Sequence, residues 1–368
     1  MKPIKLNIKT KSASYPIIIG SNIIKNLVTY LNKNSINFNK CLLVIDKKVP
    51  NKMISEITRS LGRKKIFKFV YFANEKNKNL SYVNKILQIL LSENFSRKDC
   101  LIAIGGGITG DVGGFAASLY KRGLQFINLP TTLLSQVDSS SGGKTGVNTK
   151  EGKNLIGSFY QPKIVISDIK FLKSLPKREI ICGYGEILKH SLILNKIFYK
   201  YLDNNGKKIF KLKTPFIEKA IFESCKIKKL VVEKDEKETG IRKALNFGHT
   251  FAHAYEATLG YSKNLNHGEA VILGIVTALK FSLKNKLMKT KDFQVIIKHI
   301  NKMNLPSNIK KYFSSKSLNS ILSFMKKDKK NTSKKINLIL LKKIGSLTID
   351  NQYNIEKIKK FLKKELVN

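Results

Sequence analysis

The rest of the chain is organised around residues 100–157, which read CLIAIGGGITGDVGGFAASLYKRGLQFINLPTTLLSQVDSSSGGKTGVNTKEGKNLIG. An apolar, β-branched run opens the stretch and predicts a buried parallel strand. Gly105, Gly107 and Gly110 then have the G-x-G-x-x-G spacing, and the small and apolar residues up to Tyr120 predict a helix. Because glycine lacks a Cβ and a helix N-terminus presents free N–H groups, such a turn can approach a pyrophosphate closely. The stretch predicts a nucleotide-binding turn, although packing alone also explains such glycines in some proteins.

The second half of the same stretch carries lysines beside glycines. A simple dinucleotide fold places an acidic residue about 20 positions after the turn, and residues 126–132 contain none. Instead, Asp138 is followed by Gly142-Gly143-Lys144 and by Gly152-Lys153-Asn154. Two glycine-anchored lysines close to a nucleotide-type turn predict a second bound anion.

The composition is basic but otherwise ordinary for a globular protein. The 368 residues carry a formal net charge of +44, and 42% of them are hydrophobic. Clustered Lys and Arg bind nucleic-acid phosphates non-specifically, but here lysines are spread from Lys2 to Lys364, among many Asn and Ile residues. We interpret the excess as a compositional bias that gives a solvated lysine surface, and we expect no nucleic-acid partner. Such a field would still attract an acidic substrate.

Cysteine and hydropathy patterns bear on the compartment. The four cysteines, Cys41, Cys100, Cys182 and Cys225, are scattered, and no C-x-x-C pair exists. Neither a zinc ribbon nor a disulfide framework is therefore indicated. The N-terminal residues lack an apolar core of signal-peptide length, and the longest apolar run, 270–279, is too short to span a bilayer. We expect a cytoplasmic protein without a membrane partner.

Strand-like runs alternate with helical spacing through the first half of the chain. The expected strands are 17–19, 41–46, 67–72, 100–104, 125–129 and 164–168. Beyond Leu175-Pro176, long helical patterns predominate, at 187–202, 215–232, 247–260 and 269–283, before a strand-like run at 336–344 and a terminal amphipathic helix. We predict an N-terminal α/β dinucleotide-binding domain with a mainly parallel sheet, residues 1–176, and a mostly α-helical C-terminal domain, residues 177–368. Asp46 and Glu75 follow strand ends, where each is a ribose-binding carboxylate or a turn residue.

Three of the five histidines fall close together. On a helix starting near residue 247, His249 and His253 are four apart and share a face, and His267 stands at the start of another helix. With the carboxylate of Glu186, this set indicates a three-ligand metal site with an open coordination position. Glu186 and Lys189 are three apart on a helix, which indicates a partly buried face or, alternatively, a surface ion pair.

As a set, these residues resemble one family, 3-dehydroquinate synthase. The matching segments are GGGITGDVGGFAASLYKRG, LPTTLLSQVDSSSGGKTGVN, GKNLIGSFYQP, LPKREIICGYGEILKH, RKALNFGHTFAHA and HGEAVILGIV, and they cover most of the chain in the family's order. One departure is Asn74, where the family usually has glycine, and it affects only the local turn.

The resemblance implies roles for individual residues. Zinc or cobalt would be held by Glu186, His249 and His267, whereas His253 would serve the substrate phosphate or a water network. NAD would lie on a set comprising Asp46, Glu75, Lys78, Gly105, Gly106, Gly107, Asp111, Thr131, Thr132, Lys144, Lys153, Phe171 and Ser174. Substrate groups would be met by Asp138, Lys144, Lys153, Asn154, Lys189, Lys228, Arg242, Asn246 and His253, with one of Lys329 and Lys330 and with Arg122 from the second chain of a homodimer.

The implied activity is a cyclisation without net redox change. The family converts 3-deoxy-D-arabino-heptulosonate 7-phosphate into 3-dehydroquinate and phosphate in the shikimate pathway, by transient oxidation, phosphate elimination, re-reduction, ring opening and aldol closure. The dinucleotide and the cation are expected to share a cleft between the two halves. The alternatives are another sugar-phosphate cyclase, a metal-dependent alcohol or glycerol dehydrogenase, and a nucleic-acid-binding protein.

Overall fold

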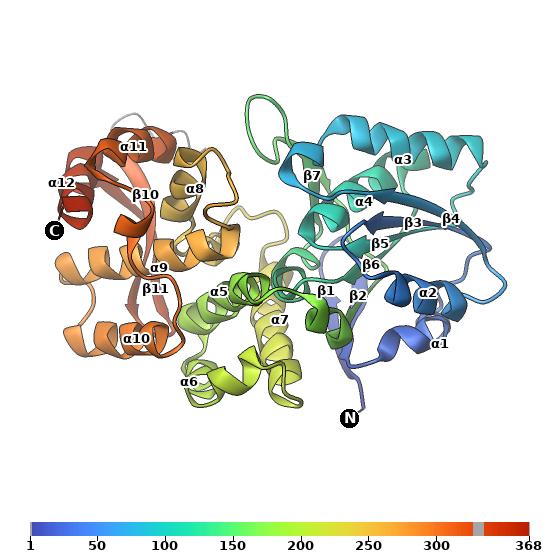
Figure 1. The fold of residues 1–368 in the computed structure, drawn as a ribbon, viewed down its shortest axis with the longest axis horizontal. Helices are drawn as coiled ribbons and strands as arrows, with labels where there is room; N and C mark the ends of the chain where they lie inside the picture. Colours follow the sequence, from blue (N-terminus) through green and yellow to red (C-terminus); the bar gives the residue numbers. More distant parts are fainter. Residues whose placement is uncertain (1, 327–334, 368) are drawn as a thin grey trace. The chain divides into compact units, whose positions relative to one another are not determined.

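A computed structural model gives the structure of the protein and describes residues 2–326 and 335–367. The chain divides into two compact units (Figure 1). Unit 1 comprises Met1–Ile180 and Leu212–Lys237, and unit 2 comprises Ile181–Lys211 and Glu238–Asn368. None of the helices in these described ranges combines the length and apolar character that a transmembrane span requires.

Unit 1 is built on a seven-stranded sheet that is parallel except at one edge. β1 pairs antiparallel with β2, and every other neighbouring pair is parallel. In order across the sheet, the strands are β1 (Ile4–Lys9), β2 (Ser14–Gly20), β9 (Ile164–Asp168), β6 (Gln125–Pro130), β5 (Cys100–Gly105), β3 (Lys40–Asp46) and β4 (Lys65–Tyr71). The predicted mainly parallel α/β domain is confirmed.

Helices cover both faces of this sheet because successive residues of a strand point to opposite faces, and in the inner strands both sets of residues are mostly apolar. Leu43 and Ile45 of β3 pack with η1 (Ile23–Asn26), α1 (Leu27–Lys33) and α2 (Asn51–Ser60). Leu42 and Val44 of the same strand pack instead with α3 (Leu80–Ser92) and α4 (Gly107–Leu119). Figure 1 shows the two helix layers on either side of the strands. Burial on both faces explains why these strands have continuous apolar sequences.

A segment from the C-terminal half of the sequence completes unit 1. α7 (Phe216–Lys234) packs against β1, β2 and the π-helical turn η4 (Ser135–Ser139). Its buried face contains Ile217, Ile221 and Val231. The predicted binding roles of residues 1–176 and 177–368 are not tested by this division. A single boundary near residue 176 is nevertheless wrong for the compact units, because α7 buries its apolar face on unit 1.

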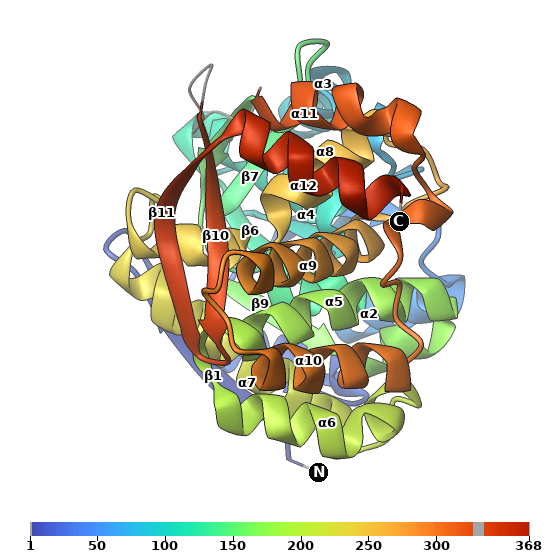
Figure 2. The same ribbon diagram turned by 90° about the vertical axis from the view of Figure 1, so that its left-hand side faces the viewer.

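Unit 2 is mainly helical, with a two-stranded hairpin before its last helix. β10 and β11 pair antiparallel, and α9 packs on β10. Figure 2 shows this hairpin at one side of the helices. The elements are α5 (Lys177–Leu194), α6 (Lys196–Phe210), η6 (Ile241–Asn246), α8 (His249–Thr258), α9 (His267–Lys284), α10 (Thr290–Lys302), η7 (Ile309–Lys311), η8 (Ser315–Ser317), α11 (Leu318–Lys326), β10 (Lys335–Lys343), β11 (Ser346–Asn354) and α12 (Ile355–Val367).

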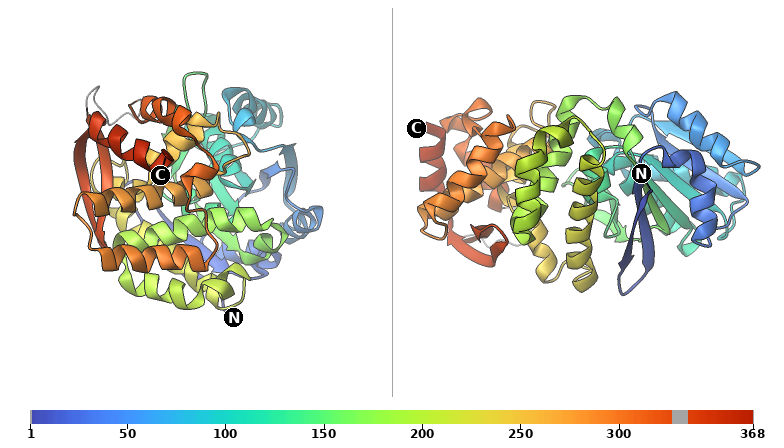
Figure 3. Two further views of the ribbon diagram at one scale, coloured as in Figure 1. Left: turned by 60° about the vertical axis from the view of Figure 1, so that its left-hand side comes forward. Right: turned by 90° about the horizontal axis from the view of Figure 1, so that it is seen from below.

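The structure corrects two expectations about individual elements. The helix predicted over 187–202 is two helices, because Asn195 ends α5 and caps α6 by accepting a hydrogen bond from the N–H of Phe198 (2.9 Å). No strand was expected before residues 17–19, but the N-terminal residues contain β1, whose Leu6 and Ile8 are buried between exposed polar neighbours. Figure 3 shows β1 paired with β2 in dark blue. The short alternation was too polar to stand out in the sequence.

Candidate metal centre and nucleotide turn

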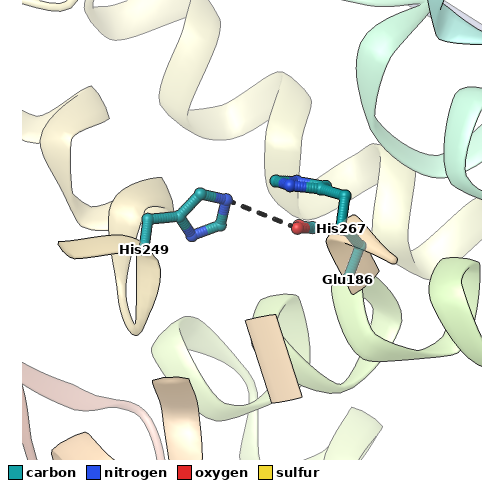
Figure 4. A group of neighbouring side chains, drawn as sticks. All are labelled: Glu186, His249 and His267. Carbon is teal, nitrogen blue, oxygen red and sulfur yellow. Dashed lines mark ion pairs between the residues drawn. The ribbon is translucent and has the colours of Figure 1, made fainter. Parts of the chain in front are cut away.

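Glu186, His249 and His267, the expected metal ligands, lie together in unit 2. Each offers one ligand atom, and these atoms all lie within 4.8 Å of one another. Glu186 belongs to α5, and the two histidines are the first residues of α8 and α9. Figure 4 shows the three side chains pointing toward one another. The structure thus brings the three residues together, while their role as ligands stays a prediction.

Two glycines allow the three helices to approach at this point. A Cβ on Gly268 would lie 2.2 Å from the Cα of Cys182, so the start of α9 can rest on α5 only because the residue is glycine. At Gly248, φ is +80°, and a Cβ would lie 2.8 Å from the backbone nitrogen of Ile275 on α9. Each glycine is the sequence neighbour of one of the two histidines. The positions of both rings therefore depend on close backbone contacts that a larger residue would prevent.

The carboxylate of Glu186 is fully buried and incompletely satisfied. It is in ion-pair contact with Lys189, which is itself buried, and its Oε1 lies 3.5 Å from Nε2 of His249. Neither contact has hydrogen-bond geometry, and neither carboxylate oxygen has a hydrogen-bond partner among the described residues. The charge of Lys189 offsets part of the cost of burying this carboxylate, but the missing hydrogen bonds leave its oxygens able to bind a further cation. Because both side chains are buried, the alternative expectation of a surface ion pair between Glu186 and Lys189 is wrong.

The histidine chemistry suits a metal ion. Burial, followed by the positive charge of Lys189, holds the pKa of His249 well below its usual 6.5. The neutral ring is the form that binds a metal. Two imidazoles and one carboxylate form a ligand set typical of zinc, and cobalt accepts the same donors. The residues present therefore fit a divalent cation with an open coordination position.

The outward nitrogens of two rings have defined partners. Nδ1 of His249 lies 3.3 Å from the carbonyl oxygen of Phe247, and Nδ1 of His267 lies 2.9 Å from Oε2 of Glu256. The ring of His253 is exposed and stacks on that of His267, with 6.1 Å between centroids. His253 is not in the group with Glu186 but forms a second potential ligand group with Glu256 and His267. This separation agrees with the expectation that His253 has a different role, which stays a prediction.

The glycine turn of unit 1 has the geometry expected for a nucleotide. Strand β5 ends at Gly105, and α4 begins at Gly107. A Cβ on Gly105 would lie 2.4 Å from Oγ1 of Thr109, and one on Gly107 would lie 2.8 Å from Oγ of Ser139. Larger side chains at these positions would collide with Thr109 and Ser139, so packing already requires glycine here, while the N–H groups at the start of α4 favour an anion. The turn therefore fits a pyrophosphate, although nucleotide binding here stays a prediction.

Charged residues expected around this turn are paired with one another. Nζ of Lys78 lies 2.5 Å from Oδ2 of Asp111 on α4 and 2.5 Å from Oδ1 of Asn154. Glu75 contacts Nζ of Lys153 at 3.3 Å and accepts a hydrogen bond from the side chain of Asn148 at 2.8 Å. These contacts join the turn η2 (Glu75–Asn77) to the loop between β7 (Lys144–Val147) and β8 (Ile156–Phe159).

A third ion pair of unit 1 involves two expected substrate residues. Nζ of Lys228, on α7, lies 2.7 Å from Oδ1 of Asp138 and 2.6 Å from its backbone oxygen. Lys228 is buried, and Asp138 lies in η4. α7 therefore positions a lysine against the segment that follows the nucleotide turn, which also explains why it packs with unit 1.

Other expected nucleotide residues occupy the ends of the parallel strands. Asp46 is buried at the end of β3, and the N–H of Thr131 donates to the carbonyl of Gly105 at 2.8 Å. The side chain of Phe171 lies in the hydrophobic core, and its carbonyl accepts a hydrogen bond from Ser174 (2.7 Å). Any contact of Phe171 with a nucleotide would fall to its backbone. The remaining members of the set here are Gly106, which precedes α4, and Thr132, which bonds Ser135.

The remaining substrate residues have the following positions. Arg242 is buried in η6, and Asn246 donates to Glu238 at 2.6 Å. Lys144 is exposed at the start of β7, and Arg122 follows α4 with φ of +62°. Lys329 and Lys330 lie outside the described residues.

Two contributors to these sites were missed at the level of sequence. Glu256 lies seven residues after His249 and three after His253, so helical spacing placed it on the histidine face. This spacing could have identified Glu256 from the sequence. Asn148 joins Glu75 and, through its N–H, the carbonyl of Lys78 (2.8 Å). A loop asparagine with such a role has no distinguishing sequence pattern.

Comparisons with known proteins agree with this geometry. Residues 68–182 match the family profile described as 3-dehydroquinate synthase N-terminal, and residues 183–331 match 3-dehydroquinate synthase C-terminal. A 3-dehydroquinate synthase of Pelagibacter ubique (strain HTCC1062) is 63% identical over 363 residues, covering 99% of both chains.

Two solved structures share the fold. One is 2-deoxy-scyllo-inosose synthase complexed with carbaglucose-6-phosphate, NAD+ and Co2+, with a TM-score of 0.86, 24% identity, and 98% of this chain and 100% of that one covered. The other is a 2-epi-5-epi-valiolone synthase from Streptomyces hygroscopicus subsp. jinggangensis with NAD+ and Zn2+ bound, with a TM-score of 0.84, 22% identity, and 97% and 98% covered. At these identities the likeness concerns the fold alone.

Proposed function

Because the chain belongs to the 3-dehydroquinate synthase family, we propose that it carries out the family's reaction with NAD and a divalent cation, zinc or cobalt. The reaction converts 3-deoxy-D-arabino-heptulosonate 7-phosphate into 3-dehydroquinate and phosphate, in the shikimate pathway that leads to chorismate and the aromatic amino acids. Phosphate leaves by elimination, so the activity is that of a carbon–oxygen lyase.

The single observation that carries the proposal is the convergence of Glu186, His249 and His267 on one point in unit 2. A buried carboxylate that has an ion-pair contact with Lys189 but no hydrogen bonds, and that lies beside a neutral imidazole, is suited to bind a cation. When bound, the cation supplies a Lewis acid for a substrate hydroxyl. NAD, when bound on the glycine turn of unit 1, supplies a hydride acceptor that returns the hydride within the same turnover.

Cationic side chains account for the two anionic groups of the substrate. We assign the carboxylate to Lys228 and Arg242, since a guanidinium can bind a carboxylate with two parallel hydrogen bonds. We assign the phosphate to Lys144, Asn154 and His253, with Lys153 close by. Holding the phosphate matters for the chemistry, because its own oxygen can take the proton next to the transient ketone before the phosphate leaves.

Two further residues would orient the hydroxyl groups. Lys189 is buried against Glu186, so its ammonium group is fixed close to the cation position. Asp138 is held by Lys228 and can accept a hydrogen bond from a hydroxyl. Asn246 would complete the hydroxyl contacts. Such a site positions groups and neutralises charge, which accounts for its many Lys, Arg and Asn residues and its lack of dedicated bases.

Arg122 is assigned to the phosphate of the second chain in a homodimer. Its backbone has φ of +62° and Lys121 before it has φ of +47°, so the chain turns sharply directly after α4. Two consecutive non-glycine residues in this conformation carry a backbone cost that a functional contact would justify.

The test is turnover of the purified, metal-loaded protein with the heptulosonate phosphate and catalytic NAD. We expect phosphate and 3-dehydroquinate to appear in equal amounts without accumulation of NADH. Net NADH without phosphate would instead identify a dehydrogenase. Turnover of a sugar phosphate that lacks the carboxylate, but not of the heptulosonate, would identify another cyclase. RNA or DNA binding with a steep salt dependence and no turnover would identify a nucleic-acid-binding protein.

A further inference from the structure

Glu256 is a buried carboxylate beside the metal centre that has no role in the reaction described above. It lies on α8, on the same face as His249 and His253, and only 7% of its side chain is exposed. Its Oε2 lies 2.9 Å from Nδ1 of His267. Burying a carboxylate costs free energy, so this contact calls for an explanation.

Distances decide whether Glu256 is a ligand or a partner of a ligand. Two donor atoms bound to one tetrahedral zinc ion at about 2.0–2.1 Å lie about 3.3 Å apart. The 3.5 Å between Nε2 of His249 and Oε1 of Glu186 is close to that separation. The 2.9 Å between Glu256 and His267 is shorter and has the length of an N–H···O hydrogen bond. The two contacts are therefore of different kinds.

We propose that Glu256 is a positioning residue for the metal centre, which acts by accepting a hydrogen bond from Nδ1–H of His267. This bond selects the tautomer that leaves Nε2 free for the cation, and it fixes the rotation of the ring. The ring of His249 is oriented in the same way by a weaker acceptor, the carbonyl oxygen of Phe247, which lies 3.3 Å from Nδ1. The His267 ring depends more on such a hydrogen bond, because 37% of its side chain is exposed, against 12% for His249, and less packing restrains it. The proposal rests on the metal site of the proposed function.

A carboxylate has a further effect that a carbonyl lacks. Its negative charge makes the imidazole of His267 a stronger donor to the cation and offsets part of the charge of the cation. Removing the acceptor should therefore weaken metal binding more than removing only its charge. If Glu256 only filled space, removing its charge and removing its acceptor would not weaken metal binding in this order. The order therefore distinguishes a positioning role from a packing role.

The test measures zinc affinity of the metal-stripped, full-length protein by competition with a chromophoric chelator. We expect Glu256→Ala to raise the zinc Kd by about 10–100-fold and Glu256→Gln, which keeps an acceptor oxygen, to raise it less. Glu218→Gln is the matched control, because Glu218 is a buried helical glutamate of unit 1 with a hydrogen bond from Thr214 (2.9 Å). It should leave the Kd unchanged. Circular dichroism melting of each metal-free variant shows whether it folds.

The visible spectrum of the cobalt-loaded protein gives a readout that does not depend on activity. If Glu256 only positions His267, cobalt-loaded Glu256→Gln keeps the band intensity of the wild type, because the number of ligands is unchanged. A change of intensity that indicates a lost ligand would overturn the proposal in favour of direct coordination. An unchanged zinc Kd in Glu256→Ala would overturn it outright. Failure of the wild type to bind zinc, or tight binding by His249→Ala, would instead contradict the metal site itself.

Discussion

The carboxylates of the metal cluster in unit 2 and of the charged network in unit 1 differ in their hydrogen bonding. Glu186 is fully buried, and neither of its oxygens has a hydrogen-bond partner among the described residues. In unit 1, Asp111, Asp138 and Glu75 each contact a lysine, and each of those lysines is itself an expected ligand-binding residue. Glu186 also has an ion-pair contact with Lys189, but its oxygens accept no hydrogen bond, whereas Asp111, Asp138 and Glu75 are held by lysine or asparagine side chains.

This difference in hydrogen bonding determines which ligand each region can bind without rearrangement. A cation entering unit 2 adds a partner to Glu186 and breaks no hydrogen bond of that carboxylate. A ribose hydroxyl or a phosphate that binds to unit 1 must share or replace an existing ion pair. The net binding free energy is then only the difference between the new contact and the ion pair that it replaces. Metal-site substitutions should therefore have larger effects than substitutions within the unit 1 pairs.

The largest effect is expected for His249→Ala. Loss of one ligand removes the cation, whose Lewis-acid contribution is several kcal/mol, so kcat should fall by about 1,000-fold or more. Phosphate release under saturating substrate is the measurement. Full metal content together with full turnover in this variant would show that the ligand assignment is wrong.

The glycine that lets α9 approach α5 gives the next prediction. In Gly268→Ala, the new Cβ would lie 2.2 Å from the Cα of Cys182, so the helices must separate at the metal ligands. We expect a loss of stability of about 2–4 kcal/mol, measured by urea unfolding, together with weaker zinc binding. Gly260→Ala, which would meet no atom within 4 Å but has φ of +62°, is the comparison variant and should cost about 1 kcal/mol. Equal stability losses would contradict the close-packing account.

Lys228→Met tests the ion pair with Asp138. The substitution removes a cation assigned to the substrate carboxylate and leaves Asp138 without this partner. A loss of about 2–3 kcal/mol, or about 30–150-fold in kcat/KM, is expected from charged hydrogen bonds of this kind. Lys226→Met is the control, since Lys226 lies on the same helix, is half exposed and lies 4.0 Å from Glu223. Metal content should be normal in both variants, because neither lysine is an expected metal ligand, and loss of metal in Lys228→Met would contradict the assignment of Lys228 to the substrate carboxylate.

Glu75→Gln should have a smaller effect. The Glu75 carboxylate is 44% exposed and already shared between Lys153 and Asn148, so a bound ribose gains little from it. We expect NAD to bind about fivefold more weakly, measured by isothermal titration calorimetry. A loss of 100-fold or more would indicate that Glu75 is released from its partners and binds the ribose alone.

A histidine outside the metal cluster gives the smallest effect and a pH dependence. Both nitrogens of His299 are bonded, Nδ1 to Asp203 (3.0 Å) and Nε2 to the hydroxyl of Tyr184 (2.9 Å). Burial, opposed by Asp203, holds the pKa of His299 below its usual 6.5. As the pH falls below about 6.5, the unfolded chain binds a proton that the folded protein does not, so stability decreases until the lower folded pKa is reached.

The measurement compares urea unfolding of the metal-free wild type and His299→Gln at pH 7.5 and 5.5. The other histidines are common to both proteins, so their contributions cancel. The wild type should lose more stability than the variant on acidification, by at most about 1.4 kcal/mol, which is the value of one full pH unit of such linkage. An identical pH response in the two proteins would contradict a depressed pKa at His299.

The sequence predicted those features that depend on local pattern. The strand that enters Gly105 and the helix that begins at Gly107 follow from apolar periodicity and glycine spacing, and both were found. The grouping of Glu186 with two histidines followed from the family resemblance, and the structure places them together. Features that depend on distant contacts were not predictable from pattern. The packing of α7 on unit 1 and the contact of Gly268 with Cys182 arise only when segments far apart in sequence meet.

The most direct test of the central claim is the zinc content of the wild-type protein after equilibrium dialysis against zinc, without nucleotide or sugar phosphate. Because Glu186, His249 and His267 are already grouped in unit 2, we expect one tightly bound zinc ion per chain, lost in Glu186→Gln and His249→Ala. Zinc that binds only after NAD is added, or that stays bound in both variants, would contradict it.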